Sequence, residues 1–306
     1  MSSNALSIPA TGAVETGGAT PSAGPFAGKG AMAMSGVILA VPDRPEIAQR
    51  VLDAAARLAE LTNSNRINVL AIRTPPVSTI LASEQVLTAE HERRIRHEEN
   101  ERIAALKQIF DTWSRATPAS KVTVEWADHE GLADQLVDEW GSRADFIVLK
   151  RPIGHQFDQE RRAIHAALFD SGRPVLVVPP ETQPAPFGRR IAVAWRDDGR
   201  TTKAVLSGLR CAAQVQEMHV LAGMRSASQT PQLPDIFDAH GIKAELHVLP
   251  VTEQESFGES LLRTAHQLGA DMLVMGAFVH PVRSLLLGGV TRHMLAHADL
   301  PVLMRR

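Results

Sequence analysis

The chain contains two copies of one pattern of apolar and helical segments, and this repeat limits the possible folds more than any other feature. In each copy a short apolar run stops at a polar, turn-forming cluster and leads into a segment with helical spacing. Two further apolar runs follow later in each copy, in the same order. Self-similarity over this length indicates a duplicated structural unit. The matching runs are 36–41 with 190–195, 144–149 with 270–275, and 172–178 with 299–304.

The apolar runs are typical of strands that are buried on both faces. They are short, rich in β-branched residues and not alternating, as expected for a parallel sheet. Helical segments separate them, so the predicted fold class is α/β, with two tandem doubly wound parallel-sheet domains. The other expected elements are strands at 67–72, 122–126, 217–221 and 244–249, and a long charged helix at about 83–115.

The domain boundaries follow from the repeat and from composition. Residues 1–34 are rich in Gly, Ala, Ser, Thr and Pro without periodic apolar residues, so we expect a disordered leader. The first domain is expected at 35–179, a linker with several prolines at 180–188, and the second domain at 189–306. An unpaired apolar edge strand is a liability, so the last strands of the two domains should pair and form a pseudo-dimer within one chain.

Composition excludes several classes of function. The net charge of -2 and the 4% aromatic content, with no Tyr, argue against binding to nucleic acid or to an anionic membrane. Cys211 is the only cysteine, so no intramolecular disulfide and no cysteine-rich metal site can form. Its apolar surroundings predict a buried packing residue rather than a reactive thiol. No apolar run is long enough to cross a bilayer, and we expect a cytoplasmic protein.

Catalytic and metal-binding motifs are absent from the sequence. No Gly-x-Gly-x-x-Gly follows a strand, and no Gly-x-Ser-x-Gly is present, which argues against a dinucleotide-dependent oxidoreductase and a serine hydrolase. His293 and His297 would share one face of the last helix, but no third ligand is evident, so we expect no metal site. No general base is paired with a nucleophile, and we expect no catalytic residues.

A glycine-containing loop at 275–293 is the most informative segment. It begins where a buried strand ends and closes at the start of a helix, with Gly276 near its beginning and Gly288-Gly289 near its end. Ligands of open α/β sheets bind outside the carboxyl ends of strands, and free N–H groups at a helix start favour anions. The alternative is that these glycines only turn the chain into the helix, and the residues alone do not decide between the two.

Residues 35–306 resemble a tandem universal stress protein. The resemblance rests on the first strands of both halves, on 270–276, on Leu285-Leu-Leu-Gly288-Gly289-Val290 and on 297–304. It implies that the second half binds ATP or a related nucleotide, with the phosphates in the glycine loop and the backbone of Val220 against adenine. The implied nucleotide-binding residues are Ala194, Trp195, Arg196, Val220, Met275, Gly276, Arg283, Gly288, Gly289, Val290 and Thr291.

The second half also departs from the nucleotide-binding pattern of that family. Val279 replaces the second glycine, the loop is one residue short, and Gly289 replaces Ser or Thr, although Thr291 offers a hydroxyl nearby. Arg196, with Asp197 next to it, occupies the position of the aspartate that contacts ribose. These departures predict weak ATP binding.

The first half departs further, because bulky and charged residues replace its glycines. Lys150 occupies the first glycine position, Arg161-Arg162 the glycine pair, and Pro42, followed by Asp43, the aspartate position. The first site is therefore expected to be lost. The resemblance as a whole implies a stress-response regulatory module that is not an enzyme.

Two alternatives remain open. One is a protein of the same fold that binds no nucleotide and acts through contacts with a regulatory protein partner. The other is an enzyme of the adenine-nucleotide α-hydrolase-like folds, which would need a Ser-Gly-Gly-x-Asp-Ser type of loop that 196–200 does not provide.

Overall fold

The computed structural model describes most of the chain beyond its N-terminal segment. The predicted leader, most of the predicted linker and Arg283 lie outside the described residues. Residues 35–306 form one compact unit. The described ranges are 36–79, 88–117, 122–153, 158–180, 186–224, 231–252, 256–278 and 287–306.

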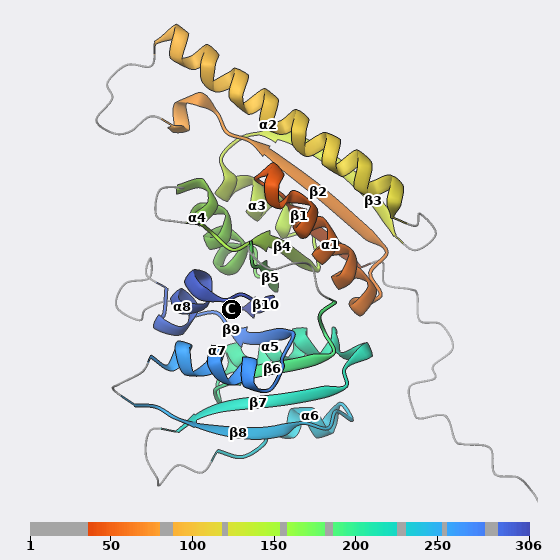
Figure 1. Cartoon of the computed structure of the whole chain (residues 1–306), viewed down its shortest axis with the longest axis vertical. Coiled ribbons are helices and arrows are strands. Elements are labelled where there is room, and N and C mark those ends of the chain that lie inside the picture. Colours follow the sequence, from red (N-terminus) through yellow and green to blue (C-terminus); the bar gives the residue numbers. More distant parts are fainter. Residues whose placement is uncertain are drawn as a thin grey trace, which may run out of the picture. The chain divides into compact units, whose positions relative to one another are not determined.

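A single ten-stranded sheet runs through this unit in the order β3-β2-β1-β4-β5-β10-β9-β6-β7-β8 (Figure 1). All neighbouring strands are parallel except β5 and β10, which pair antiparallel with Leu303 opposite Leu176. The predicted pairing of the last strands of the two halves is thereby confirmed. The strands are β1 (Val37–Val41), β2 (Arg66–Arg73), β3 (Thr123–Glu130), β4 (Phe146–Lys150), β5 (Val175–Val178), β6 (Arg190–Trp195), β7 (Glu217–Met224), β8 (Glu245–Pro250), β9 (Met272–Gly276) and β10 (Val302–Arg305).

Helices cover both faces of the sheet, which explains why the central strands are apolar on both sides. One buried cluster joins the sheet to α3, α4, α7 and α8, and another joins it to α1, α2, α5 and α6. Both clusters contain residues from both halves, so the described core is continuous across the β5–β10 seam. The helices are α1 (Pro45–Thr62), α2 (Ala89–Ala116), α3 (Ala133–Gly141), α4 (Asp158–His165), α5 (Gly199–Leu209), α6 (Asp235–Ala239), α7 (Phe257–Gln267) and α8 (Gly289–His297), with short turns η1 (Pro76–Thr79), η2 (Ala166–Asp170) and η3 (Ala212–Gln214).

The predicted α/β class is confirmed, and the strand order fixes where ligands can bind. In each half the chain crosses from one side of its first strand to the other, which creates a crevice between β1 and β4 and another between β6 and β9. Because β5 and β10 are antiparallel, the strands of the two halves run in opposite directions. The carboxyl ends of the strands of one half therefore lie at the opposite end of the sheet from those of the other half. The division into two domains at 35–179 and 189–306 stays a prediction, since 35–306 forms one unit.

Two large apolar side chains of the described residues are exposed. Leu206 of α5 is 41% exposed because the helix turns its Val205 side toward the sheet. Val248 on the edge strand β8 is 40% exposed.

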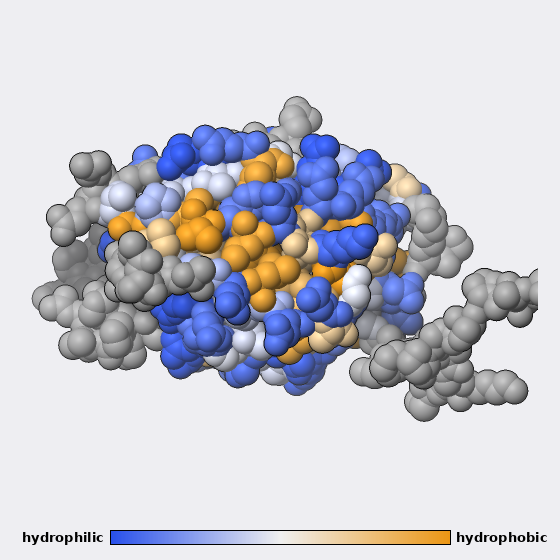
Figure 2. Space-filling view, turned by 90° about the horizontal axis from the view of Figure 1, so that it is seen from below, coloured by the Kyte–Doolittle hydropathy of each residue, from blue (hydrophilic) through white to orange (hydrophobic). Residues whose placement is uncertain are grey.

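The face seen in Figure 2 carries a band of apolar residues flanked by charged and polar ones. Among the described helices, none is both long and apolar enough to cross a membrane.

Cys211 is fully buried, as the sequence predicts. It lies directly after α5, and burial raises the pKa of its thiol to about 12. The thiol is therefore protonated at neutral pH and is a packing group, because thiolate is the reactive form of cysteine.

Candidate functional site

The crevice of the second half lies where β6 and β9 end side by side. Ala194 of β6 is the register partner of Met275 of β9, and both strands end within two residues of this level. The N-termini of α5 and α8 begin just beyond these strand ends. The structure therefore brings together the predicted residues at the ends of β6 and β9 and the glycine pair at the start of α8.

The ring of Phe278 occupies the space at the end of β9. A Cβ placed on Gly276 would lie 2.8 Å from Phe278 Cε2 and 3.2 Å from Thr201 Oγ1, so only glycine admits this packing. The Arg196 guanidinium lies 4.0 Å from the centre of the same ring, and that of Arg200 lies 5.4 Å away, both within cation–π range. The position at which a carboxylate would contact ribose is therefore occupied by Arg196, whose guanidinium lies over the ring of Phe278.

Backbone hydrogen bonds close the two ends of the glycine loop on each other. Gly288 N donates to Phe278 O at 2.7 Å, and Phe278 N donates to Thr291 Oγ1 at 3.1 Å. Thr291 is fully buried. The hydroxyl expected to face a phosphate therefore holds the loop against α8 in this conformation.

The start of α8 offers backbone donors to solvent. Gly288 is the N-cap and has no side chain to satisfy the first amides. The amides of Gly289 and Val290 have no hydrogen-bond partner among the described residues. A Cβ on Gly289 would meet no atom of the described residues within 4 Å. An anion can approach these amides along the side of Gly289.

Asp198 is a residue of this region that the sequence reasoning missed. Its side chain caps α5, accepting hydrogen bonds from Arg200 N and Thr201 N, and it pairs with Arg196 Nε at 2.5 Å. Partial burial alone would raise the pKa of the Asp198 carboxyl, but these donors hold it below its usual value. Asp197, singled out as the carboxylate next to Arg196, is exposed. The signal for the cap was Asp directly before a helix.

Two other predicted residues, Trp195 and Val220, lie at different distances along their strands from the crevice. Trp195 is half-buried at the end of β6 and packs against the α5 side of the core. Val220 lies in the middle of β7, paired with Val193 on one side and Leu246 on the other. Since Trp195 is level with Ala222, a ligand at the strand ends would meet β7 near Ala222 rather than near Val220. Val279 and Arg283 lie outside the described residues.

The corresponding crevice of the first half is filled by buried charges. The Lys150 side chain is 3% exposed, and its Nζ lies 3.1 Å from Asp43 Oδ2 and 2.6 Å from Glu160 Oε2. Arg44 binds the other oxygen of Glu160 at 2.7 Å. Burial raises the pKa of the Asp43 carboxyl, Lys150 counteracts this, and Glu160 adds to it. The glycine position of the first half therefore holds a lysine that neutralises two carboxylates.

A groove of about 1090 Å³ lies between α4 of the first half and α8 of the second half, with Gly289 on its border. No Asp or Glu lines it among the described residues. Burial, followed by the nearby His297, lowers the pKa of His293, so that histidine is neutral at neutral pH. The basic and histidine side chains of the groove are Arg151, Arg161, His165, Arg292, His293 and His297.

A second group of polar side chains, which the sequence reasoning also missed, lies on β7 and β8. His219, Glu245 and His247 bring three potential metal-ligand atoms within 4.8 Å of one another. The sequence signal was Glu245-x-His247, which places both side chains on one face of a strand. The rings of His293 and His297 lie with their centres 4.7 Å apart and are tilted by 44°, and no third ligand joins them among the described residues.

Comparison with known proteins finds a family model that matches the second half and solved structures that resemble most of the chain. Residues 189–306 match the model of the universal stress protein family. No curated protein sequence matches the chain. These findings agree with the resemblance inferred from the sequence for the second half.

Solved structures resemble most of the chain in fold. A universal stress protein from Archaeoglobus fulgidus DSM 4304 has a TM-score of 0.64 at 15% identity, covering 89% of this chain and 96% of that one. A putative universal stress protein from Pseudomonas aeruginosa UCBPP-PA14 has a TM-score of 0.56 at 17% identity, covering 90% and 95%. The cytoplasmic domain of a prokaryotic cation chloride cotransporter has a TM-score of 0.50 at 13% identity, covering 88% and 94%. At these identities the likeness shows the fold alone.

Proposed function

We propose that this protein is a non-catalytic, tandem universal stress protein that binds ATP or a related nucleotide in its second half. The observation that carries the proposal is the start of α8, where the amides of Gly289 and Val290 lack partners among the described residues and Gly289 leaves room in front of them. The match of 189–306 to the family model supports this half as the binding half. The phosphates would lie against Gly289 and Val290, with the ribose and base toward the ends of β6 and β7.

The filled crevice of the first half supports a division of labour. Lys150, Asp43 and Glu160 form a compact network where the second half has Gly276 and Phe278. A nucleotide would have to separate these charges without replacing their partners, at a cost of several kcal/mol. The first half is accordingly proposed as a structural and regulatory partner of the second.

Binding in the second half should be weak, since the loop lacks several expected contacts. Phe278 must move from Gly276 before a ribose can enter, and Arg196 offers no acceptor for ribose hydroxyls. Arginine can instead contact a phosphate. We expect a dissociation constant in the micromolar range or weaker, which corresponds to roughly -8 kcal/mol or a less favourable value.

A Gly289→Val substitution should abolish nucleotide binding without unfolding the protein. Among the described residues no atom lies within 4 Å of the added Cβ, and Gly289 is not among the positive-φ glycines, so no strain is expected. It would occupy the space through which phosphates reach the amides of α8. Isothermal titration with ATP and with ADP measures the effect, and Arg162→Ala, an exposed change on α4, is the matched control.

The two variants distinguish a specific loss of phosphate binding at the start of α8 from a general loss of ATP binding. Arg162→Ala is expected to bind ATP as the wild type does. If Gly289→Val binds ATP with unchanged affinity, the phosphates do not lie at the start of α8 and this assignment is wrong.

A second candidate function is a regulatory protein of the same fold that binds no nucleotide and acts through protein contacts. The observation that favours it is Phe278, whose ring fills the crevice and is covered by Arg196. The resemblance to a cytoplasmic transporter domain illustrates that this fold serves in more than one setting. Absence of ATP binding at millimolar concentration would favour this candidate.

A further inference from the structure

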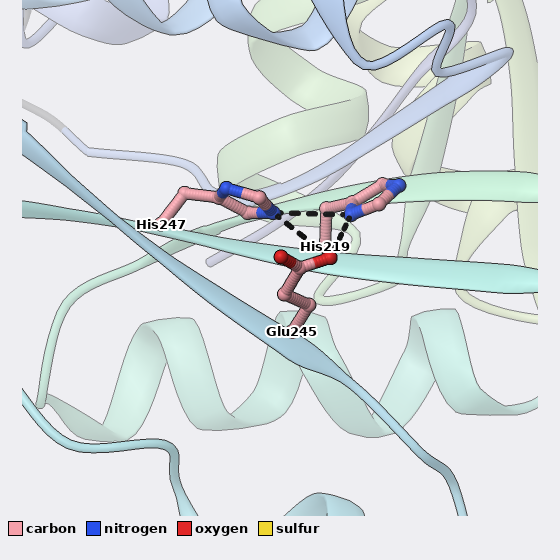
Figure 3. A group of neighbouring side chains, drawn as sticks. All are labelled: His219, Glu245 and His247. Carbon is pink, nitrogen blue, oxygen red and sulfur yellow. Dashed lines mark hydrogen bonds and ion pairs between the residues drawn. The ribbon is translucent and has the colours of Figure 1, made fainter.

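Two histidines and a glutamate converge on one face of the sheet at its outer edge (Figure 3). His219 Nδ1 lies 3.1 Å from His247 Nε2, and Glu245 Oε2 lies 3.8 Å from each of these nitrogens. His219 is on β7, and the other two residues are on the edge strand β8. Glu245 is the register partner of His219, and His247 follows two residues later, so strand alternation places all three on the same face.

The two imidazole nitrogens are spaced as a shared metal ion requires. Zinc–nitrogen bonds of about 2.0–2.1 Å in a tetrahedron separate two ligand nitrogens by about 3.3 Å. The observed separation of 3.1 Å is close to this value. The Glu245 carboxylate is slightly farther away, but its side chain is 70% exposed and can rotate toward the nitrogens. Little rearrangement would therefore be needed for three-point coordination.

The other ring nitrogen of His219 is buried and faces a carboxylate. Nε2 makes no hydrogen bond among the described residues, and Glu217 Oε2 lies 3.5 Å from it. Ligand histidines commonly direct their second nitrogen at a carboxylate, which fixes the tautomer and makes the ligand nitrogen more basic. With the proton on Nε2, the lone pair of Nδ1 points at His247. The His219 side chain is only 9% exposed, so this orientation is held by packing.

A fourth position remains accessible from solvent. A groove of about 560 Å³ between β8 and α7 is lined by His247, Ser260 and Thr264. The His247 side chain is 22% exposed, so an ion and a water molecule can reach the cluster from that side. Two histidines and one carboxylate with an open position form a ligand set used by zinc sites.

We propose that His219, Glu245 and His247 bind one divalent transition-metal ion, Zn²⁺ in preference to Mg²⁺ or Ca²⁺. Nitrogen ligands favour the transition metals, whereas Mg²⁺ and Ca²⁺ prefer all-oxygen sites. The ion would join the edge strand β8 to β7. The site is separate from the start of α8 and does not depend on nucleotide binding.

The test is calorimetric titration of the full chain with Zn²⁺, in the absence of nucleotide and without a polyhistidine tag. The expected result is one Zn²⁺ per chain and none of Mg²⁺. Glu245→Gln keeps the size of an exposed side chain and removes the anionic ligand. Its affinity for Zn²⁺ should fall by more than the roughly 10- to 100-fold that losing an outer-shell partner causes.

His297→Ala is the matched control, since it removes one member of a histidine pair that belongs to no group of three ligand atoms among the described residues. It should bind Zn²⁺ as the wild type does, and melting curves in EDTA should show that both variants fold. Co²⁺ added to the wild type should give the intense visible bands of a tetrahedral site. The proposal is overturned if the wild type binds no Zn²⁺, if Glu245→Gln binds it unchanged, or if His297→Ala loses it.

Discussion

A Lys150→Ala variant is expected to lose about 3–5 kcal/mol of unfolding free energy, the usual cost of removing one partner from a buried ion pair. The lysine side chain is 3% exposed and lies within 3.1 Å of carboxylate oxygens of both Asp43 and Glu160. Without it, two neighbouring carboxylates face each other, and Arg44 remains paired with Glu160 alone. Urea-induced unfolding monitored by circular dichroism measures the loss.

The matched control for this variant is Arg94→Ala. Arg94 forms an ion pair with Glu98 on the surface of α2, and its side chain is 66% exposed. Exposed pairs of this kind contribute about 0–1 kcal/mol, so this change should be nearly neutral. Equal losses in the two variants would show that the Lys150 network does not stabilise the first half.

The loss in Lys150→Ala should also depend on pH. Burial and the neighbouring Glu160 already raise the pKa of the Asp43 carboxyl, and removing the lysine that counteracts them raises it further in the folded state. The folded variant then binds a proton more readily than the unfolded one, so its deficit is largest at neutral pH and shrinks as the pH falls through the folded pKa of Asp43. A deficit that is constant between neutral and mildly acidic pH would contradict this electrostatic cause.

A Leu303→Ala variant should destabilise both halves together, by about 2–5 kcal/mol. Leu303 of β10 is fully buried and lies opposite Leu176 of β5, at the centre of the antiparallel seam. Both buried clusters extend across this seam, so the two halves share a continuous core there. Tryptophan fluorescence, which reports mainly on the first half through Trp113, Trp126 and Trp140, should give the same urea midpoint as circular dichroism.

Leu206→Ala provides the control for the seam variant. Leu206 is 41% exposed on α5, and surface changes of this kind usually stay within about 0.5 kcal/mol. Two separated transitions in Leu303→Ala, with the fluorescence midpoint unchanged, would mean that the halves unfold independently.

The fold could be predicted from the sequence because its signals are local and repeated. The apolar runs at 144–149 and 270–275 could only be strands buried on both faces, and the helical segments between them required parallel connections. The pairing of β5 with β10 followed from the need to cover two apolar edges. The exposure of Leu206 could not be predicted, because apolar spacing gives a helix face but not the angle at which that face meets the sheet.

The candidate sites were less predictable, since their contacts join distant segments. The glycine loop could be recognised, but the packing of Phe278 on Gly276 and under Arg196 depends on how β6 and β9 meet. Lys150 could be identified as a departure from the glycine pattern, yet its two carboxylate partners come from separate segments. His219 and His247 belong to different strands, and only the register of β7 with β8 brings them together.

The most direct test of the proposed function is the stoichiometry of ATP binding to the wild-type chain, measured by calorimetry with ATP raised to millimolar concentration. One ATP per chain, with a dissociation constant in the micromolar range or weaker, is the result that a cradle at α8 and a filled first crevice predict. Phe278→Ala, which removes the ring from the crevice, should bind at least as tightly as the wild type. Two ATP molecules per chain would contradict the loss of the first site, and no heat or thermal shift with the wild type would contradict nucleotide binding itself.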